Sequence, residues 1–386
     1  MKRFEELDSL RGLAAFSVFL HHALLMLLFT ELGFSQMTLP QKILYSSPTH
    51  LIWAGTEAVF LFFVLSGFVL SLPFYSAKYS GYMPFLIKRI FRLYPPFFFT
   101  LLIALGGITL IPHGAIGGLS GWFNTLWADP IDFKSVLSHF SMIGHFNTEL
   151  LDSPIWSLVV EMRISIIFPL IMFVVMKFNW KITIVIAAIL TVMPYQLVKL
   201  GFGNEINAFV FTIAYIPMFI YGALLAKHLR VIMKFYSTIP TKGKVLLVLA
   251  AIFMFTCRFF PIHISFLRVP MINNTIETMG ACLFVWFAVS SKVFAKILHI
   301  KPFVFMGKIS YSFYLYHMVL LISITHLLYQ YVNLPVIWLL SLSLSILIAT
   351  LSFKFIEQPF MTLGRNVSLQ LTNKNKGEEK IAQRLA

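Results

Sequence analysis

The sequence predicts an all-α integral membrane protein, a bundle of about ten transmembrane helices. Composition, apolar runs and loop charges carry this prediction. Of the 386 residues, 59% are hydrophobic and 12% are charged, whereas a water-soluble protein of this length needs far more polar surface. The two cysteines, Cys257 and Cys282, lie in apolar stretches, which excludes a disulfide framework or a zinc cluster.

Apolar runs long enough to cross a bilayer follow one another along the chain. A transmembrane helix needs about 20 apolar residues. Arg258 and Glu277 shorten the seventh and eighth runs, although an arginine near a helix end can reach the membrane interface. We expect helices at residues 9–29, 51–75, 91–111, 154–176, 182–199, 207–226, 244–261, 274–291, 309–329 and 335–355.

Loop charges orient these spans. Twenty-four of the 30 lysines and arginines fall in the termini and loops on one side of the membrane, and five fall on the other side. Because basic residues favour the cytoplasmic side, both termini are expected in the cytoplasm. Residues 112–152 are then outside, and residues 227–244 are inside. The net charge of +15 therefore reflects topology, and we expect no nucleic-acid partner.

The amino terminus does not have the pattern of a cleavable signal, because Glu5, Glu6 and Asp8 lie in its charged region. We expect one transmembrane domain over residues 1–364 and a polar, disordered cytoplasmic tail over 365–386. No soluble catalytic domain is visible. Any chemistry is therefore expected within the bundle or at its edges.

The first span, in "DSLRGLAAFSVFLHH", carries ionisable groups where they are unfavourable. Arg11 and His22 are eleven residues apart, so they share a helical face about 16 Å apart along the axis. Asp8 lies close to the helical face that Arg11 and His22 share, whereas His21 points about 80° away from it. A snorkelling arginine and a polar pair satisfied inside the bundle would also explain the pattern. Intramembrane ionisable groups nevertheless favour a functional role.

The second and third spans add a carboxylate and a basic pair. Glu57 lies in the outer part of the second span. In "FLIKRIFRLYPP", Arg89 and Arg92 are neighbours on one face at the cytoplasmic mouth of the third span. Ordinary membrane anchoring is one interpretation. A phosphate clamp is the other, because guanidinium groups match phosphate geometry.

The fourth span places Ser157, Glu161 and Ser165 four residues apart, so they form one polar stripe, with Arg163 facing roughly the other way. An ion pair with another helix would explain these charges structurally. The ninth span, "GKISYSFYLYHMVLL", contains Tyr311 and places His317 near the depth of His22.

The tenth span ends in "FIEQPF". Here Glu357 lies at its inner end, and Pro359 is expected to stop the helix.

Depth orders these residues: basic groups lie at the cytoplasmic mouth, two histidines near the midplane and acids in the outer half. A charged donor from inside, a base in the middle and a hydroxyl acceptor from outside would need that order. The outer tryptophans Trp122, Trp127 and Trp156 would stack on a sugar or mark the interface.

Together the motifs resemble the membrane-bound acyltransferase family 3, a large family of inner-membrane O-acyltransferases. The resemblance rests on Arg11 followed by ten residues and His22, and on "FFVLSGFVLS", "KRIFRLYPP", "WSLVVE", "GKISYSFYLYH" and "IEQPF". These motifs occur in family order over nearly the whole chain. The family's ten or so spans with cytoplasmic ends agree with the count above.

The resemblance implies transfer of an acyl group, commonly acetyl, from cytoplasmic acyl-CoA to a hydroxyl of a cell-surface glycan, a lipid-linked sugar or a related acceptor. It implies acyl-CoA as donor substrate at the plasma membrane, and no metal or permanently bound cofactor is expected. By position, His22 matches the family's essential histidine, Arg11 its paired arginine and Glu161 the acid of its Trp-Ser-Leu motif. Arg89 and Arg92 match its donor-binding basic motif.

Two departures concern the acceptor. Family members often have Glu-Glu-Gln-Phe-Tyr where this chain has "EMRIS", so Arg163 is unusual. Many relatives also append an extracytoplasmic esterase-like domain, and none is visible here. The acceptor is therefore expected to be handled by the bundle, with homo-oligomerisation or a separate partner as further alternatives.

We predict that His22 is the general base, with Arg11 and Glu161 in the catalytic set and Arg11, Arg89 and Arg92 binding the donor. An acyl-histidine intermediate is the alternative route. A transporter or flippase is the competing class, but it would predict two repeated halves with broken helices, and no repeat is visible. The supporting polar residues are expected to be Asp8, Glu57, Ser157, Arg163, Tyr311 and His317.

Overall fold

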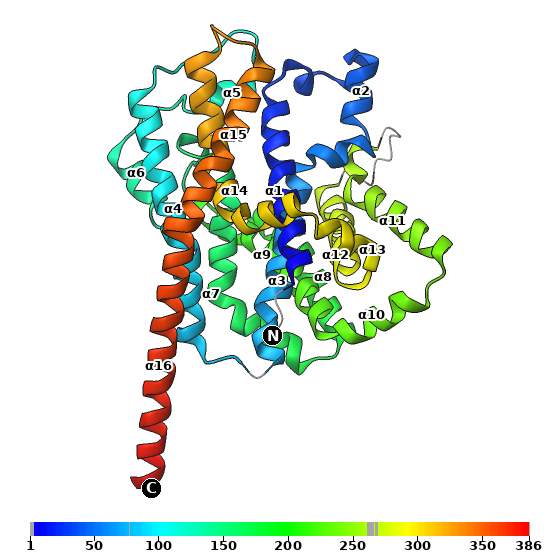
Figure 1. The fold of residues 1–386 in the computed structure, drawn as a ribbon, viewed down its shortest axis with the longest axis vertical. Coiled ribbons are helices and arrows are strands. Elements are labelled where there is room, and N and C mark those ends of the chain that lie inside the picture. The colour runs from blue at the N-terminus through cyan, green and yellow to red at the C-terminus, as the bar shows by residue number, and fades with distance from the viewer. Residues whose placement is uncertain (1–3, 77, 261–265, 267–268, 386) are drawn as a thin grey trace.

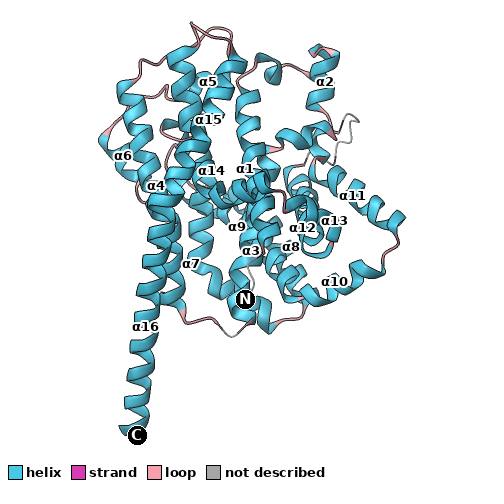
Figure 2. Ribbon diagram, viewed as in Figure 1, coloured by secondary structure: helices cyan, strands magenta, loops and turns pink. Residues whose placement is uncertain are grey.

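The structure, a computed structural model, describes residues 4–76, 78–260, 266 and 269–385, and regular elements in this part of the chain are helices (Figures 1 and 2). The predicted all-α class is therefore confirmed. The long helices are α1 (Glu5–Leu25), α3 (Gly55–Tyr75), α4 (Tyr82–Leu110), α7 (Trp156–Lys177), α8 (Trp180–Leu197), α9 (Asn204–Lys227), α11 (Thr241–Phe255), α12 (Pro270–Ser290), α14 (Lys301–Leu328), α15 (Leu334–Ser352) and α16 (Gln358–Leu385). The short α-helices are α2 (Leu39–Tyr45), α5 (Gly121–Thr125), α6 (Phe133–His139), α10 (Leu229–Thr238) and α13 (Lys292–Leu298).

Eight helical segments in the described part of the chain are long and apolar enough to cross a membrane. They match eight of the ten predicted spans, and the protein is a multi-pass membrane protein. The other two predicted spans correspond to α1 and α11. Helix α11 has only 15 residues, and the polar groups of α1 lower its mean hydropathy. The eight segments are Gly55–Tyr75, Tyr82–Leu110, Ser153–Lys177, Trp180–Leu200, Asn204–Lys227, Pro270–Ser290, Lys301–Leu328 and Leu334–Asn373.

Helix α1 lies inside the bundle, packed mainly against α14 and α3. Its contact with α14 is a backbone contact, because a Cβ atom added at Gly12 would lie 2.5 Å from the Gly307 nitrogen. Small residues permit such close crossings in membranes. This crossing fixes the register between the two helices that carry the predicted histidines.

Figure 1 shows both chain ends toward the lower end of the bundle, and α2, α5 and α6 in its upper half. This arrangement agrees with termini on one side and the 112–152 segment on the other. Within that segment, Trp127 is only 1% exposed and donates a hydrogen bond to the Leu151 carbonyl at 3.0 Å. Trp127 is therefore a core residue and cannot stack on a sugar.

The end of the chain differs from the prediction. Pro359 does not stop the helix, because a π-helical segment over Phe353–Glu357 joins α15 to α16 without a break. A π-turn relaxes the hydrogen-bond ladder before the proline, which itself lacks an N–H. Helix α16 then continues to Leu385, so the segment 365–386, expected to be disordered, is helical as far as the structure describes it. Its leucines, lysines and glutamates favour a helix.

Candidate active site

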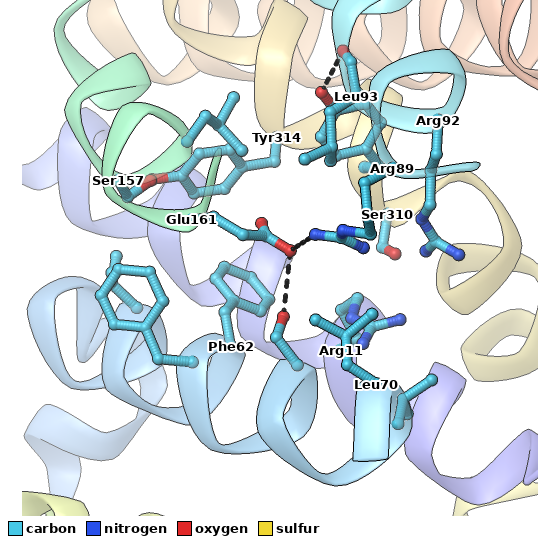
Figure 3. Close-up of a pocket in the computed structure, with 16 residues that line it drawn as sticks. Arg11, Phe62, Leu70, Arg89, Arg92, Leu93, Ser157, Glu161, Ser310 and Tyr314 are labelled. Atoms are coloured by element: carbon cyan, nitrogen blue, oxygen red, sulfur yellow. Dashed lines mark hydrogen bonds and ion pairs between the residues drawn. The ribbon is translucent and has the colours of Figure 1, made fainter. Parts of the chain in front are cut away.

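A narrow cavity lies among α1, α3, α4, α7 and α14, with a volume of about 80 Å³, or about 700 Å³ with its open mouth, and we call it the chamber. Arg11, Arg89, Arg92 and Glu161 lie around this one space in Figure 3. Three guanidinium groups and one carboxylate leave the chamber positively charged, which favours an anionic ligand. The remaining walls are mostly apolar and are formed by Val59, Phe62, Phe63, Val69, Leu70, Leu93 and Leu158, with Ser66, Ser157, Ser310, Tyr311 and Tyr314.

An ion pair between α4 and α7 forms one wall of the chamber. The Arg89 Nη2 atom lies 2.6 Å from Glu161 Oε1, and Arg89 Nε donates to Ser165 Oγ at 3.1 Å. Ser66 Oγ also donates to Glu161 Oε1, at 3.1 Å. The predicted polar stripe of α7 is confirmed, and its carboxylate meets the predicted basic motif of α4. Arg89 is thus bound within the protein, with only 6% of its surface exposed.

Arg163 does not contact Arg89 or Glu161. The sequence predicted this, because Arg163 faces roughly the other way on α7. It donates hydrogen bonds to the carbonyls of Ile143, Gly144 and Ala208 and to Thr212 Oγ1. These bonds tie the outer segment 143–144 to α9. The structure therefore gives Arg163 a connecting position and does not bring it to the chamber.

A second cavity continues the chamber toward the predicted cytoplasmic side, and Arg11, Arg92 and Tyr311 line both. With its open mouth it encloses about 1520 Å³, and Lys308 and Arg365 also line it. We call it the basic mouth. Lys308 lies inside the quoted ninth-span motif but was not predicted as a site residue, and Arg365 was assigned to the tail.

Two supporting residues at the basic mouth have partners within the protein. Asp8 lies 3.6 Å from Arg11 Nη1, one helical turn away on α1. The Tyr311 hydroxyl donates to the Leu93 carbonyl at 2.6 Å and so ties α14 to α4. Asp8 is thus placed to orient Arg11, and Tyr311 to fix the chamber wall.

The two histidines predicted at similar depth are in contact. His22 Nδ1 lies 3.0 Å from His317 Nε2, and His317 Nδ1 lies 2.7 Å from the Tyr314 carbonyl oxygen. Because a carbonyl only accepts, His317 Nδ1 carries the proton and a neutral His317 offers a lone pair at Nε2. His22 Nδ1–H then donates to that lone pair. The network leaves the lone pair of His22 at Nε2, which is the form a general base needs.

His22 and His21 face different surroundings, as the helical phase predicted. The Trp122 ring of the outer segment stacks on His22 with ring centroids 5.7 Å apart. His21 instead places Nδ1 3.1 Å from the Trp53 carbonyl and lies against Gly55. His21 is thus fixed by the backbone, whereas His22 joins α14 and the outer segment.

A hydroxyl pair connects the chamber to the histidines. Ser157 Oγ and Tyr314 Oη are 2.8 Å apart, and both residues line the chamber. The same Tyr314 offers its carbonyl to His317. Tyr314 therefore belongs both to the chamber wall and to the hydrogen-bond network of the histidine pair.

Glu57 does not lie in the chamber. Its side chain is 1% exposed, and its Oε1 lies 3.9 Å from His50 Nε2 in the outer part of the bundle. Among the described residues, no group of three His, Cys, Asp or Glu side chains could hold a metal ion.

Asp152, which precedes the span Ser153–Lys177, is a residue that the sequence analysis missed. It is fully buried, and its carboxylate oxygens have no hydrogen-bond partner among the described residues. Burial raises the pKa of Asp152 well above its usual value. A lone acid in a polar loop gives no sequence signal of burial.

Asp152→Asn is expected to stabilise the protein as pH rises. Because the pKa of Asp152 is raised in the folded state, this residue does not lower the wild-type stability below about pH 4, the pKa in the unfolded state. Above that pH the free energy of unfolding falls by about 1.4 kcal/mol per pH unit until the pH reaches the pKa of the folded state. Asparagine does not titrate. Thermal unfolding in detergent should show the variant's advantage growing as the pH is raised above about 4, the usual pKa of an aspartate. An advantage that is constant with pH would contradict this account.

Fold and site together define a multi-pass membrane protein with a positively charged chamber, one wall residue of which, Tyr314, bonds a histidine pair. Residues 4–354 match the acyltransferase domain family Acyl_transf_3. The chain therefore belongs to this family, the membrane-bound acyltransferase family 3, and the resemblance in the motifs is confirmed.

Individual relatives are more distant. The chain is 25% identical over 344 residues to the "Putative peptidoglycan O-acetyltransferase YrhL" of Bacillus subtilis (strain 168), covering 81% of this chain and 52% of that protein. It is 36% identical over 75 residues to the O-acetyltransferase OatA of Staphylococcus aureus (strain NCTC 8325 / PS 47), covering 19% of this chain and 12% of that protein. The chain thus spans about half the length of the first relative. No solved structure matches it significantly.

Proposed function

We propose that this chain is an O-acyltransferase of the plasma membrane, which moves an acyl group, acetyl in the first instance, from cytoplasmic acyl-CoA to a hydroxyl of a cell-surface glycan. The observation that carries the proposal is that the basic mouth adjoins the chamber and that Tyr314 of the chamber wall bonds His317, which in turn holds His22 with its lone pair at Nε2. The names of its relatives, which are O-acetyltransferases, support the same reaction.

The donor binds with its phosphates in the basic mouth. Arg92 and Arg11 line both the mouth and the chamber, and Lys308 lines the mouth. Arg89 is already bonded to Glu161 and Ser165, so its role is to hold Glu161 and the chamber wall. Arg92 is then the phosphate-binding member of the basic motif, because guanidinium groups bind phosphate through paired hydrogen bonds.

The acyl group must travel from the mouth to His22. Arg11 and His22 are eleven residues apart on α1, which corresponds to about 16 Å along the helix. The extended pantetheine arm of coenzyme A is long enough to cover this path. The apolar chamber walls exclude water from the thioester and so limit its hydrolysis.

His22 acts as general base. The acceptor oxygen attacks the thioester carbonyl carbon while its proton passes to His22 Nε2. The tetrahedral adduct then collapses, the C–S bond breaks, and the proton on His22 passes to the coenzyme A thiolate. The products are an ester and free coenzyme A. Acyl-histidine formation is the alternative, and an acyl group trapped on His22 with donor alone would support it.

Arg92→Ala is expected to raise the KM for acetyl-CoA by about 10- to 100-fold, because a hydrogen bond to a charged group is removed. The KM for the acceptor should stay nearly unchanged. Arg92→Lys should restore part of the donor affinity, since a point charge lacks the paired geometry. The measurement is steady-state kinetics of the full-length protein in vesicles.

Lys308→Ala should raise the same KM by less, because Lys308 is exposed to solvent. Lys301→Ala is the matched control: Lys301 lies on the same helix and does not line the described mouth. Unchanged donor kinetics in Arg92→Ala would mean that the basic pair only anchors the protein in the membrane.

A further inference from the structure

A separate, larger cavity lies in the predicted outer half of the bundle, and we call it the outer cavity. Its volume is about 740 Å³, which lies within the roughly 300–1,000 Å³ of a small-molecule site. It lies among α2, α3, α7, α9 and α12, and its lining includes Tyr45, Trp156, Tyr215, Arg258 and Asn274. The proposed reaction has so far used none of these residues.

One layer of side chains separates this cavity from the chamber. Trp156 lines the outer cavity, and the next residue, Ser157, lines the chamber. Tyr215 of the outer cavity packs against Phe63 of the chamber with ring centroids 5.3 Å apart, and against Trp156 at 5.7 Å. A ligand in the outer cavity is therefore separated from the chamber by this layer of side chains alone.

The outer cavity also adjoins the end of α1 that carries the histidines. Trp53 lies between the cavity and this end of α1. Its ring centroid is 6.1 Å from that of Tyr45 in the cavity wall and 5.7 Å from that of His21. His22 is the next residue along α1. Trp53 and His21 thus form the layer of side chains between the cavity and the part of α1 that carries the proposed base.

The lining has the chemistry of a carbohydrate site. Trp156, Tyr215 and Tyr45 are partly exposed aromatic rings, whose faces contact the apolar C–H faces of sugar rings while their polar edges stay hydrated. Asn274 and Arg258 supply amide and guanidinium groups at the same cavity, which bond to sugar hydroxyls. A few polar groups on an aromatic wall give such a site orientation and specificity.

The charge of the outer cavity differs from that of the chamber. Arg258 is the charged side chain among its described lining residues. Its Nε lies 3.6 Å from Oε1 of the fully buried Glu277, and its Nη2 donates to Asn274 Oδ1 at 3.1 Å. The outer cavity thus has at most one positive charge, against a surplus of two in the chamber, and it favours a ligand of low charge over a polyanion.

We propose that the outer cavity binds the acceptor and that this acceptor is an uncharged carbohydrate chain, stacked on Trp156 and Tyr215. One of its hydroxyls passes the aromatic layer, loses its proton to His22 and takes the acyl group from the thioester, releasing coenzyme A. This inference rests on the proposed acyltransferase function, and it adds the class of acceptor and the place where it binds.

Calorimetric titration of the purified full-length protein tests it, with N,N′,N″-triacetylchitotriose (chitotriose below) as the uncharged probe and trigalacturonate as the anionic one. Trp156→Ala should weaken chitotriose binding by about tenfold, since stacking and buried area are lost. Trp156→Phe retains a ring and should lose less, which separates binding from misfolding. Trp180→Ala is the matched control, because Trp180 is 50% exposed on α8 and outside the described lining, and should bind like wild type.

The proposal is overturned if chitotriose does not bind, if Trp156→Ala binds it as tightly as wild type, or if trigalacturonate binds more tightly. Acetyl-CoA titrated into the same samples separates this proposal from the acyltransferase function. Acetyl-CoA binding without chitotriose binding rejects the acceptor site alone. Chitotriose binding that depends on Trp156 without acetyl-CoA binding rejects the acyltransferase function and supports a carbohydrate site.

Discussion

His22→Ala is expected to lower the rate of acyl transfer by about 10²- to 10⁴-fold, the usual contribution of general-base catalysis. His22 Nδ1 is hydrogen-bonded to His317, so the basic lone pair lies on His22 Nε2. The variant lacks this lone pair. Transfer from acetyl-CoA to acceptor in vesicles measures this loss. Acetyl-CoA affinity should change little, because the donor phosphates are proposed to bind in the basic mouth, away from His22.

His21→Ala is the matched control for this prediction. His21 is the adjacent residue on the same helix, but its Nδ1 bonds to the Trp53 carbonyl, so its loss should affect the rate much less. A His21→Ala loss larger than that of His22→Ala would reject His22 as the base. A His22→Ala loss far below a hundredfold would also count against general-base catalysis.

Glu161→Ala is expected to reduce the free energy of unfolding by about 3–5 kcal/mol, because it leaves a buried guanidinium without its partner. The Arg89 and Glu161 side chains are only 8% and 15% exposed, and their atoms approach to 2.6 Å. Activity should fall with stability, since the chamber wall loses its fixed geometry. Unfolding in mixed micelles measures the stability.

The double variant Glu161→Ala/Arg89→Met should recover most of that stability, since it removes the uncompensated charge together with its partner. Arg89→Met alone should be less damaging than Glu161→Ala, because Ser66 still donates a hydrogen bond to the carboxylate. If the double variant is as unstable as the sum of the two single variants, the two residues are not coupled as the structure indicates.

Helical periodicity predicted which residues share a face, and the structure agrees. Arg11 lines cavities together with Tyr311 of α14, and His22 contacts His317 of the same helix. The identity of the facing helix could not be predicted, because it depends on the backbone contact of Gly12 with Gly307. Periodicity describes one helix, whereas the contact between two helices depends on how both pack.

The basic motif and the acidic stripe show a second limit. Arg89 was predicted as part of a basic pair at the cytoplasmic mouth, and Glu161 as part of a polar stripe that an ion pair with another helix would explain. The partner could not be named, because 72 residues separate the two in the chain. Only the packing of α4 against α7 shows that they bind each other. The division between Arg89, which holds Glu161, and Arg92, which lines the basic mouth, follows from that contact.

The outer cavity was beyond sequence reasoning for the same reason. Arg258 and Glu277 were predicted only as interruptions of apolar runs, and the structure pairs them at 3.6 Å. Of the three outer tryptophans, Trp127 is core, Trp122 stacks on His22, and Trp156 lines the cavity. Composition places tryptophan at the membrane interface, but only the fold distinguishes these three positions.

Mass spectrometry of envelope glycans and lipids tests the central claim most directly, because it does not require the acceptor to be known in advance. Three strains are compared: one without this protein, one complemented with the wild-type chain and one complemented with His22→Ala at equal protein level. We predict ester-linked acyl groups that appear with the wild-type chain and are absent in the other two strains. Identical acyl profiles with and without the wild-type chain, or full restoration by His22→Ala, would contradict the account.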